Sequence, residues 1–253
     1  MSSSGVLVVT GGSRGIGAAI STLAAERGWS VVVNYASDVA AAEHVVAAIH
    51  AKGGEAIAVR GDVSQPEDVA HIFAAADRIG PLKGLVNNAG IVGRTARVEA
   101  LDAAHINRMF AVNVTGSFLC AIEAIKRMST RYGGTGGGIV NIGSAAAKLG
   151  AANACVDYAA SKGAIDSFTV GLAIEVANEG IRVNGVRPGV IDTEIHASGG
   201  EPDRAANMAS QIPMQRPGTA DEVAKAVLWL LSEEAAYTTG SVVSVTGGRA
   251  ISA

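Results

Sequence analysis

Short apolar segments alternate along this chain with longer segments of helical periodicity. The short segments are rich in β-branched residues, and most of their apolar positions are consecutive. They lie at residues 6–10, 31–35, 56–60, 85–89, 138–144, 181–186 and 241–247. Unbroken apolar runs of this length are typical of strands buried on both faces, as strands are in parallel sheets. The pattern therefore predicts a parallel sheet built from these seven segments.

The intervals between these strands are predicted to be helices. In the first interval apolar residues recur at helical spacing, at Ile16, Ile20, Leu23 and Ala24, and Gly28 stands where such a helix would end. Further helices are predicted at 38–52, 66–79, 102–129, 155–179 and 220–232. The expected N-caps are Asp38 and Ser64, and the expected stops are Gly53 and Gly180. This alternation predicts a doubly wound, Rossmann-type α/β sheet, in which ligands bind beyond the carboxyl ends of the strands.

Length and composition limit what the chain can be. Its 253 residues, 49% of them hydrophobic, can bury the core of one domain, so we expect a single domain over 1–253. We find no internal repeat and no linker, and the glycine-rich stretch 133–138 is short enough to be a flexible turn. The net charge is −3 and the charges are dispersed, which argues against a nucleic-acid partner.

Two further features concern the compartment. The first residues lack a basic region, and we see no continuous apolar stretch of the roughly 18 residues that a membrane span needs, so we expect no membrane partner. Cys120 and Cys155 lie in apolar surroundings without C-x-x-C spacing, as buried thiols do in a reducing compartment. The expected location is the cytoplasm.

A glycine-rich stretch follows the first predicted strand. In VLVVTGGSRGIGAAI (6–20) the glycines are close to the dinucleotide fingerprint G-x-G-x-x-G, but Ile20 stands where the last glycine should be. The loop opens a helix, whose N-terminal N–H groups and dipole favour an anion such as pyrophosphate. A turn that only allows close packing of the helix explains the glycines equally well.

Four polar residues point to chemistry at the same end of the sheet. Tyr158 and Lys162 are four apart on a predicted helix and share one face, where the ammonium group is expected to lower the pKa of the phenol from about 10. Ser144 ends the fifth strand, where its hydroxyl could polarise a carbonyl oxygen, and Asn113 interrupts a helical pattern. Taken alone, Tyr158 with Lys162 is more simply a surface pair and Ser144 a helix cap. Asn113 alone is more simply an amide that hydrogen-bonds a neighbouring backbone group. Together on one α/β sheet they predict a single site.

The chain resembles the short-chain dehydrogenase/reductase family over essentially its whole length. The resemblance is carried by TGGSRGIG (10–17), NNAG (87–90), Asn113, Ser144, YAASK (158–162) and RPGVIDT (187–193). The T-G-x-x-x-G-x-G spacing of that family accounts for the mismatch with the shorter fingerprint.

The resemblance implies roles for the four polar residues. Tyr158 is expected to protonate a carbonyl oxygen in reduction, or to act as the base in oxidation, and Ser144 to bind the same oxygen. Lys162 is expected to bind the nicotinamide ribose, and Asn113 to hold a water in a proton relay through Lys162. The hydride comes from the nicotinamide, and the protein supplies position and electrostatics.

The resemblance also implies a set of cofactor-binding residues and no metal. They are Gly11, Ser13, Arg14, Gly15, Ile16, Gly17, Asn34, Asp62, Val63, Asn88, Ala89, Gly90, Tyr158, Lys162, Pro188, Gly189, Ile191 and Thr193. Within this set, Asp62 is expected at the adenine, residues 88–90 at the adenosine ribose, and Ile191 with Thr193 at the carboxamide.

The cofactor is expected to be NADP(H), with NAD(H) possible. Sites selective for NAD place an acidic residue at the end of the second strand to bind the ribose 2′-hydroxyl, and this chain has Asn34 there. Arg14 in the glycine-rich loop could bind a 2′-phosphate through several donors.

The expected reaction is hydride transfer between nicotinamide and a small carbonyl compound or secondary alcohol (a CH–OH group). A cofactor-sensing protein without activity is the alternative, but all four polar positions carry reactive residue types. Residues 192–217 are expected to form a lid hinged at Gly199 and Gly200, and its polar residues, among them Glu194 and His196, suit a sugar-like ligand. His196 is more simply a solvent-facing loop residue.

A reductase for 3-oxoacyl groups on acyl carrier protein is the second alternative. That acidic partner would require basic residues beside the site, and the stretch between Lys162 and Arg182 has Asp166, Glu175 and Glu179 instead.

The two helices at 102–129 and 155–179 are apolar on more than one face. The residues concerned are Met109, Phe110, Phe118, Leu119 and Ile122 in the first and Phe168, Val170, Leu172 and Ile174 in the second. A helix that is apolar all round must be buried, so we expect a homotetramer or homodimer.

Overall fold

Seven parallel strands form one sheet in the computed structural model, which describes residues 5–193 and 204–250. The strands are β1 (Val6–Val9), β2 (Ser30–Tyr35), β3 (Glu55–Arg60), β4 (Leu82–Asn87), β5 (Gly137–Ile142), β6 (Ile181–Pro188) and β7 (Val242–Val245). Their order in the sheet is β3-β2-β1-β4-β5-β6-β7. The chain thus builds outward from β1 to β3 and then returns to the other side of β1, which puts a topological switch point between β1 and β4. The predicted doubly wound α/β fold is confirmed.

The strand boundaries differ from the predicted ones by up to three residues: β4 begins three residues earlier and ends two earlier, β6 ends two later, and β5 and β7 each end two earlier than predicted. The polar Lys83 and the small Gly84 hid the start of β4 from a hydropathy pattern, yet Gly84 pairs with Leu7 of β1 and Gly138 of β5. β6 continues through Arg187 to Pro188, which pairs with Val245 of β7.

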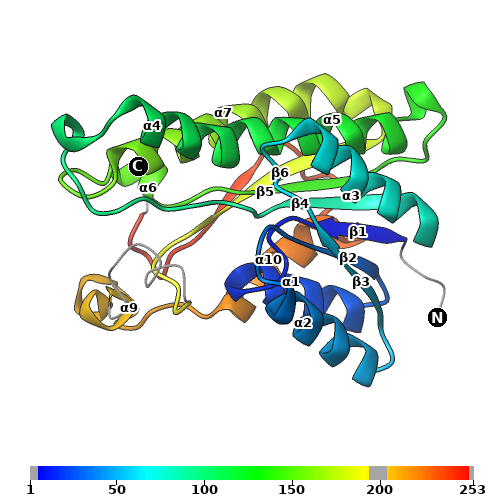
Figure 1. Cartoon of the computed structure of the whole chain (residues 1–253), viewed down its shortest axis with the longest axis horizontal. Helices are drawn as coiled ribbons and strands as arrows, with labels where there is room; N and C mark the ends of the chain where they lie inside the picture. The colour runs from blue at the N-terminus through cyan, green and yellow to red at the C-terminus, as the bar shows by residue number, and fades with distance from the viewer. Residues whose placement is uncertain (1–4, 194–203, 251–253) are drawn as a thin grey trace.

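Helices cover both faces of the sheet (Figure 1). The α-helices are α1 (Gly15–Glu26), α2 (Val39–Ala51), α3 (Pro66–Ile79), α4 (Ala103–Phe110), α5 (Gly116–Met128), α6 (Ala146–Leu149), α7 (Val156–Val176), α9 (Arg204–Asn207) and α10 (Ala220–Leu231). Short 3₁₀ turns are η1 (Val98–Ala100), η3 (Thr130–Tyr132), η4 (Ala177–Glu179), η5 (Ala209–Gln211) and η6 (Glu233–Ala235), and η2 (Ala111–Thr115) is a π-helical turn.

The expected helix ends are confirmed at Asp38 but not at Ser64. The Asp38 carboxylate accepts a 3.0 Å hydrogen bond from the Ala41 N–H, as an N-cap does. Helix α3 begins at Pro66 with Gln65 as its cap residue, so the prediction for Ser64 was wrong. The Ser64 hydroxyl instead donates to the Asp62 carboxylate at 2.8 Å. Gly53 and Gly180 both follow helical segments with φ of +77° and thus act as the expected stops.

The predicted helix 102–129 is one continuous helical segment with a π turn in its middle. At Ala103–Met128 this segment is long and apolar enough to span a membrane by length and composition, so the expectation that no stretch would reach that threshold was wrong. The polar residues of η2 interrupt the apolar run and hid its length. Met109, Cys120 and Met128 are fully buried in the described structure, where this segment forms part of a helical layer on the sheet.

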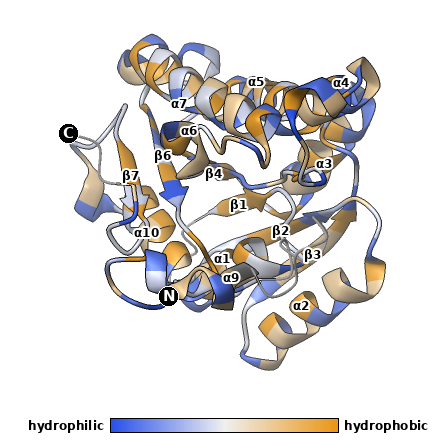
Figure 2. Ribbon diagram, turned by 90° about the vertical axis from the view of Figure 1, so that its left-hand side faces the viewer, coloured by the Kyte–Doolittle hydropathy of each residue, from blue (hydrophilic) through white to orange (hydrophobic). Residues whose placement is uncertain are grey.

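Alternate residues of the central strands pack into two cores. Val6 and Val8 face the core under α3, α5 and α7, whereas Leu7 and Val9 face the core under α1, α2 and α10. Figure 2 shows these helical layers on the two sides of the sheet from a second direction. Because both faces of the central strands are covered, a ligand reaches them at the edge of the sheet, where loops follow the strand ends.

Candidate active site

The loop from β1 to α1 is shaped so that only glycine fits at its key positions. Gly15 has φ of +50°, and a Cβ at Gly17 would overlap the carbonyl oxygen of Gly11. Ser13 is buried and Ile16 packs on the core, whereas Arg14 is exposed and makes no side-chain cap. The loop therefore brings backbone N–H groups and one cation to the carboxyl end of β1, a place suited to an anion.

The expected cofactor residue Asn34 is a support of this loop. Its side chain is buried, its Oδ1 accepts the Gly11 N–H at 3.2 Å, and its Nδ2 donates to the Gly61 carbonyl at 3.0 Å. Both ends of the amide are thereby engaged within the protein. The exposed residues beyond the end of β2 are Ala36 and Ser37.

A cation that the sequence reading missed lies beside these residues. Arg60 ends β3 opposite Tyr35 of β2, and its Nε donates to the Ala36 carbonyl at 3.3 Å while the side chain stays exposed. The signal in the sequence was a basic residue at the last position of the third predicted strand. It indicates a cation near Ala36 only once β3 is known to pair with β2.

The NNAG turn after β4 is locked to the first strand. Thr10 Oγ1 accepts hydrogen bonds from the N–H groups of Asn88 (2.9 Å) and Ala89 (3.0 Å). Asn88 Nδ2 donates in return to the carbonyls of Thr10 (2.9 Å) and Gly11 (3.0 Å). These contacts bring residues 88–90 next to the glycine-rich loop.

Asp62 and Val63 follow β3 on the same edge. The Asp62 carboxylate accepts from the Ser64 N–H at 3.0 Å and from Arg108 of α4 at 2.9 Å. Although burial by itself raises it, the pKa of Asp62 lies below its ordinary value because Ser64 and Arg108 donate to the charged form. Val63 is buried and would contact a Cβ at Gly116 of α5, so its side chain belongs to the core.

Ser144, Tyr158 and Lys162 meet at the end of β5. Ser144 lies two residues after the strand, and its hydroxyl is close enough to the Tyr158 phenol to act on the pKa of that phenol. Tyr158 and Lys162 share one face of α7, with the Lys162 Nζ 5.8 Å from the centre of the Tyr158 ring. The Lys162 side chain is buried, and its Nζ donates to the Ile142 carbonyl at 2.8 Å.

The pKa values of this pair are set first by burial. Burial raises the pKa of Tyr158, and the Ser144 hydrogen bond opposes that rise. This is the reverse of the lowering we expected from Lys162, because that expectation counted the neighbouring charge and not the loss of water. Burial also lowers the pKa of Lys162 to about 8, and Asp166 one turn further along α7 opposes this change. The pair thus holds a protonated phenol beside an easily deprotonated ammonium group.

Asn113 lies in the π turn η2 and binds the backbone of Ile91. Its Oδ1 accepts the Ile91 N–H at 2.8 Å, and its Nδ2 donates to the Ile91 carbonyl at 3.0 Å and to Ser161 Oγ at 3.1 Å. A Cβ at Gly90 would lie 3.3 Å from Asn113 Oδ1 and 3.5 Å from Lys162 Nζ, so both groups border the NNAG turn. The structure therefore brings four side chains together around the end of β5. We refer to them below as the tetrad: Asn113, Ser144, Tyr158 and Lys162.

The segment after β6 closes the site toward the glycine-rich loop. The Pro188 carbonyl accepts the Ala145 N–H at 2.9 Å, and the Gly189 N–H donates to Val245 at 2.9 Å. Thr193 lies against Gly15, where a Cβ would be 3.4 Å from Thr193 Cβ. Ile191 is buried and pairs with Gly218.

The expected lid is described only in part. Glu194, His196, Gly199 and Gly200 lie outside the described residues. In the described part, the Asp192 N–H donates to the Gly218 carbonyl at 2.9 Å, which joins the two ends of the 192–217 segment.

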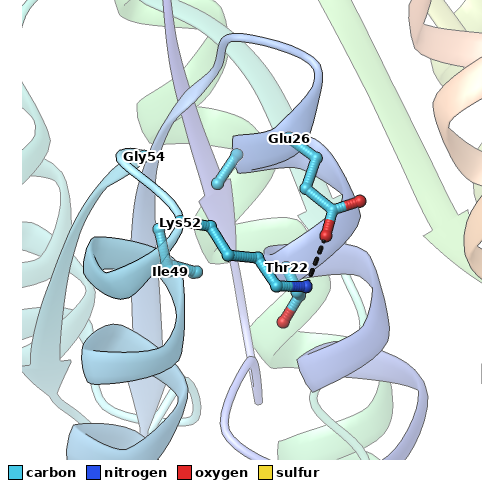
Figure 3. Close-up of a pocket in the computed structure, with 6 residues that line it drawn as sticks. Thr22, Glu26, Ile49, Lys52 and Gly54 are labelled. Carbon is cyan, nitrogen blue, oxygen red and sulfur yellow. Dashed lines mark hydrogen bonds and ion pairs between the residues drawn. The ribbon is translucent and has the colours of Figure 1, made fainter.

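A pocket between α1 and α2 offers a contrast with this site (Figure 3). It is lined by Thr22, Ala25, Glu26, Ile49, Lys52 and Gly54. The Lys52 ammonium pairs with Glu26 at 2.7 Å across it, and the tetrad contributes none of its lining. We assign it no chemistry.

Comparison with known proteins identifies relatives that cover nearly the whole chain. A family model described as Enoyl-(Acyl carrier protein) reductase matches residues 11–250. The "Uncharacterized oxidoreductase YgfF" of Escherichia coli (strain K12) is 53% identical over 245 residues, which are 96% of this chain and 99% of that protein. "Glucose 1-dehydrogenase 2" of Bacillus subtilis (strain 168) is 37% identical over 245 residues, 96% of this chain and 94% of that protein.

Solved structures show the same architecture. The short-chain dehydrogenase/reductase from Serratia marcescens BCRC 10948 has a TM-score of 0.90 at 34% identity, covering 98% of this chain and 99% of that one. A blue fluorescent protein from a metagenomic library, crystallised in complex with NADPH, has a TM-score of 0.88 at 33% identity, covering 98% and 99%. The likeness extends over both the sheet and its site-bearing edge.

Proposed function

The chain belongs to the short-chain dehydrogenase/reductase family, and from that premise we propose that it is an active enzyme that transfers a hydride between NADP(H) and a small carbonyl compound or secondary alcohol. The observation that carries the proposal is the meeting of Ser144, Tyr158 and Lys162 at the end of β5. A protein that only senses the cofactor has no need of a phenol placed beside a serine hydroxyl and a buried ammonium group.

The glycine-rich loop fits a dinucleotide. Gly17 lets the start of α1 pack directly against the Gly11 carbonyl, and at Gly15 a Cβ would lie 3.4 Å from Thr193, so the start of α1 stands between the loop backbone and Thr193. The pyrophosphate would bind the N–H groups at the start of α1, and the nicotinamide would extend toward Thr193 and Lys162. When bound, the nicotinamide supplies or accepts the hydride.

The protein's own residues handle the proton. In reduction, Ser144 donates a hydrogen bond to the substrate oxygen and Tyr158 transfers its phenolic proton to the same oxygen. A raised pKa keeps Tyr158 protonated at neutral pH, which is the form an acid requires. The Lys162 ammonium stabilises the phenolate that results, and Asn113 holds the turn against which Lys162 packs.

Preference for NADP(H) is proposed from the charges near the end of β2. Ala36 and Ser37 offer no carboxylate to repel a 2′-phosphate, and Arg14 and Arg60 are exposed cations on the adjoining loop and strand. The NADPH complex of the metagenomic protein is consistent with this preference. NAD(H) remains an acceptable cofactor in the proposal because the loop contacts are common to both.

For the substrate we propose a small hydroxylated compound such as a sugar. The polar character of residues 192–217 and the relative named glucose 1-dehydrogenase support this class. The alternative is a 3-oxoacyl group on acyl carrier protein. In the structure Glu175 and Glu179 lie at the C-terminal end of α7 and on the turn that leads into the start of β6, at the edge of the sheet opposite the site, so these two acidic residues give no argument against that carrier.

We propose that two or four copies associate through α5 and α7. Phe118, Ile122, Val170 and Ile174 are exposed on these helices, and Phe118 stacks on Phe168 with ring centres 3.8 Å apart. Met109 and Leu172, which we had included in this apolar set, are buried within the protein. Symmetric pairing of the exposed residues would remove them from water.

A reducing compartment, the cytoplasm, suits the two buried thiols, Cys120 and Cys155.

A screen of alcohols, polyols and keto-esters with NADPH, NADP⁺, NADH and NAD⁺ tests the proposal. The expected result is turnover of at least one class, faster with the phosphorylated cofactor, and its loss in Tyr158→Phe. Tight cofactor binding with no turnover of any compound would support the sensing alternative. Turnover of only carrier-bound acyl groups would overturn the substrate class.

A further inference from the structure

A histidine and an aspartate outside the tetrad form a close pair next to Tyr158. His105 of α4 lies with its Nε2 2.7 Å from Oδ2 of Asp157, the residue that precedes Tyr158 on α7. The Asp157 side chain is 6% exposed and the His105 side chain 25% exposed. None of the roles described above uses either residue.

Because the Asp157 carboxylate is buried, its contact with His105 affects the position of α7. A carboxylate removed from water is costly unless other groups bind it. The first turn of α7 favours an acidic side chain through its N–H groups and dipole, but it is His105 that contacts this one from another helix. The position of Asp157, and of the helix turn that carries it, is therefore linked to α4.

The contact is one of two side-chain hydrogen bonds that join the α4–η2 segment to α7. His105, Met109 and Asn113 follow one another at intervals of four along α4 and η2, and Asp157 and Ser161 do so on α7. His105 of α4 binds Asp157, and Asn113 of η2 binds Ser161 one turn further along α7. The Ser161 hydroxyl also donates to the Tyr158 carbonyl at 2.7 Å. The backbone of Tyr158 thus lies between two side-chain cross-links.

His105 also covers the loop that follows the NNAG turn. A Cβ at Gly93 would lie 2.5 Å from Cε1 and 2.7 Å from Nε2 of the His105 ring. The same loop is bound at Ile91 by Asn113 and at Ala96 by the Ala154 carbonyl, at 2.8 Å. The imidazole therefore sits where this loop, α4 and the first turn of α7 meet.

We propose that His105 is a positioning residue for the reaction: by binding Asp157 it holds the first turn of α7 so that the phenol of Tyr158 stays in hydrogen-bonding register with Ser144. The proposal rests on the function proposed above, in which Tyr158 is the acid. It predicts that loss of the His105–Asp157 contact reduces proton transfer and leaves the glycine-rich loop, which is bound by Asn34 and Asn88, unchanged.

The test compares His105→Phe, which keeps a ring but no donor, with His105→Gln, which keeps an N–H. The matched control is His44→Phe on the exposed face of α2. We expect kcat to fall by about 10- to 100-fold in His105→Phe, since a small misplacement of a reacting group has effects of this order. His105→Gln should recover most of kcat. The Kd for NADPH, measured by fluorescence, should stay within about 2-fold of wild type in all variants.

Three further variants separate positioning from general stability. In a Tyr158→Phe background, His105→Phe should cause no further loss of kcat, because its effect acts through the missing phenol. Asp157→Ala should reproduce the loss, and His105→Phe should add nothing to it. Asp157→Ala also provides the measurement if His105→Phe fails to fold.

Several outcomes would overturn the proposal. These are wild-type kcat in His105→Phe or in Asp157→Ala, no recovery in His105→Gln, or an equal further loss on the Tyr158→Phe background. Full activity of Tyr158→Phe by itself would overturn the proposed acid, and it is scored separately from the two variants in the wild-type background.

Discussion

The Nζ of Lys162 donates a 2.8 Å hydrogen bond to the backbone carbonyl of Ile142, the last residue of β5. This bond joins the second turn of α7 to the end of β5, and Ser144 lies two residues after that strand end. Tyr158 and Lys162 are therefore placed by one helix that is bound to the end of β5, and Ser144 by the short loop that follows this strand, which favours a precise arrangement.

Tyr158→Phe is expected to remove most turnover while cofactor affinity stays near wild type. Only the phenolic oxygen is lost, and proton transfer by a positioned side chain contributes about 10²- to 10⁴-fold. Steady-state kcat and the Kd for NADPH by fluorescence measure the two effects. Wild-type kcat in this variant would mean that another group is the acid.

Activity in the direction of carbonyl reduction is expected to decline as pH rises through about 8. Burial lowers the pKa of Lys162 to about 8, so above that pH the ammonium charge that stabilises the phenolate is lost. Tyr158 stays protonated over this range because its own pKa is raised. Lys162 is thus the group that limits the alkaline side of the profile.

A Lys162→Arg variant checks this assignment. Arginine stays charged throughout this range, so the alkaline limb of the kcat profile should move to higher pH even if the absolute rate falls. An unchanged limb would assign it to a different group. Arg14→Ala, which does not touch the proton path, is the control and should keep the wild-type limb.

Arg14→Ala is expected to raise KM for NADPH by about 10-fold or more and to change KM for NADH little. A guanidinium bound to a 2′-phosphate contributes several charge-assisted hydrogen bonds that the unphosphorylated ribose cannot make. Arg60→Ala should act in the same direction with a smaller effect, since its Nε is already bonded to Ala36. Equal weakening of both cofactors would exclude phosphate recognition by these residues.

Gly17→Ala is expected to abolish cofactor binding and to lower the melting temperature. The added Cβ would overlap the carbonyl oxygen of Gly11, so the loop would have to move. Gly171→Ala is the matched control, because a Cβ there meets nothing within 4 Å and α7 would gain about 0.5–1 kcal/mol of stability. Calorimetric titration with NADPH and thermal unfolding separate the two effects. Normal binding by Gly17→Ala would place the dinucleotide elsewhere.

Ile174→Asp is expected to break the proposed assembly. Ile174 on α7 is 75% exposed in the single chain, and a charge there would have to be buried in a symmetric interface. Light scattering at micromolar concentration should show a smaller species than wild type, while Val39→Asp on α2 should not change the mass. A wild-type protein that is monomeric at that concentration would exclude the assembly.

Much of the fold and the tetrad could be predicted from the sequence because the signals are local. Apolar runs, helical spacing and the Asp38 cap depend on residues within a few positions of one another, and they predicted the seven parallel strands and most helices. Motif order likewise indicated the tetrad. The physical reason is that backbone propensity and side-chain periodicity act over one or two turns of chain.

Only the tertiary structure decided which residues far apart in the sequence come into contact, and how burial away from water changes the pKa of a side chain. Asn34 turns inward because Gly11 and Gly61, 23 and 27 residues away, engage its amide, and Arg60 reaches Ala36 only because β3 pairs with β2. His105 meets Asp157 across 52 residues. The direction of the Tyr158 pKa also followed from burial, which no spacing of residues encodes. Such partners are chosen by packing, since a polar group buried by the fold must bind whatever the fold brings to it.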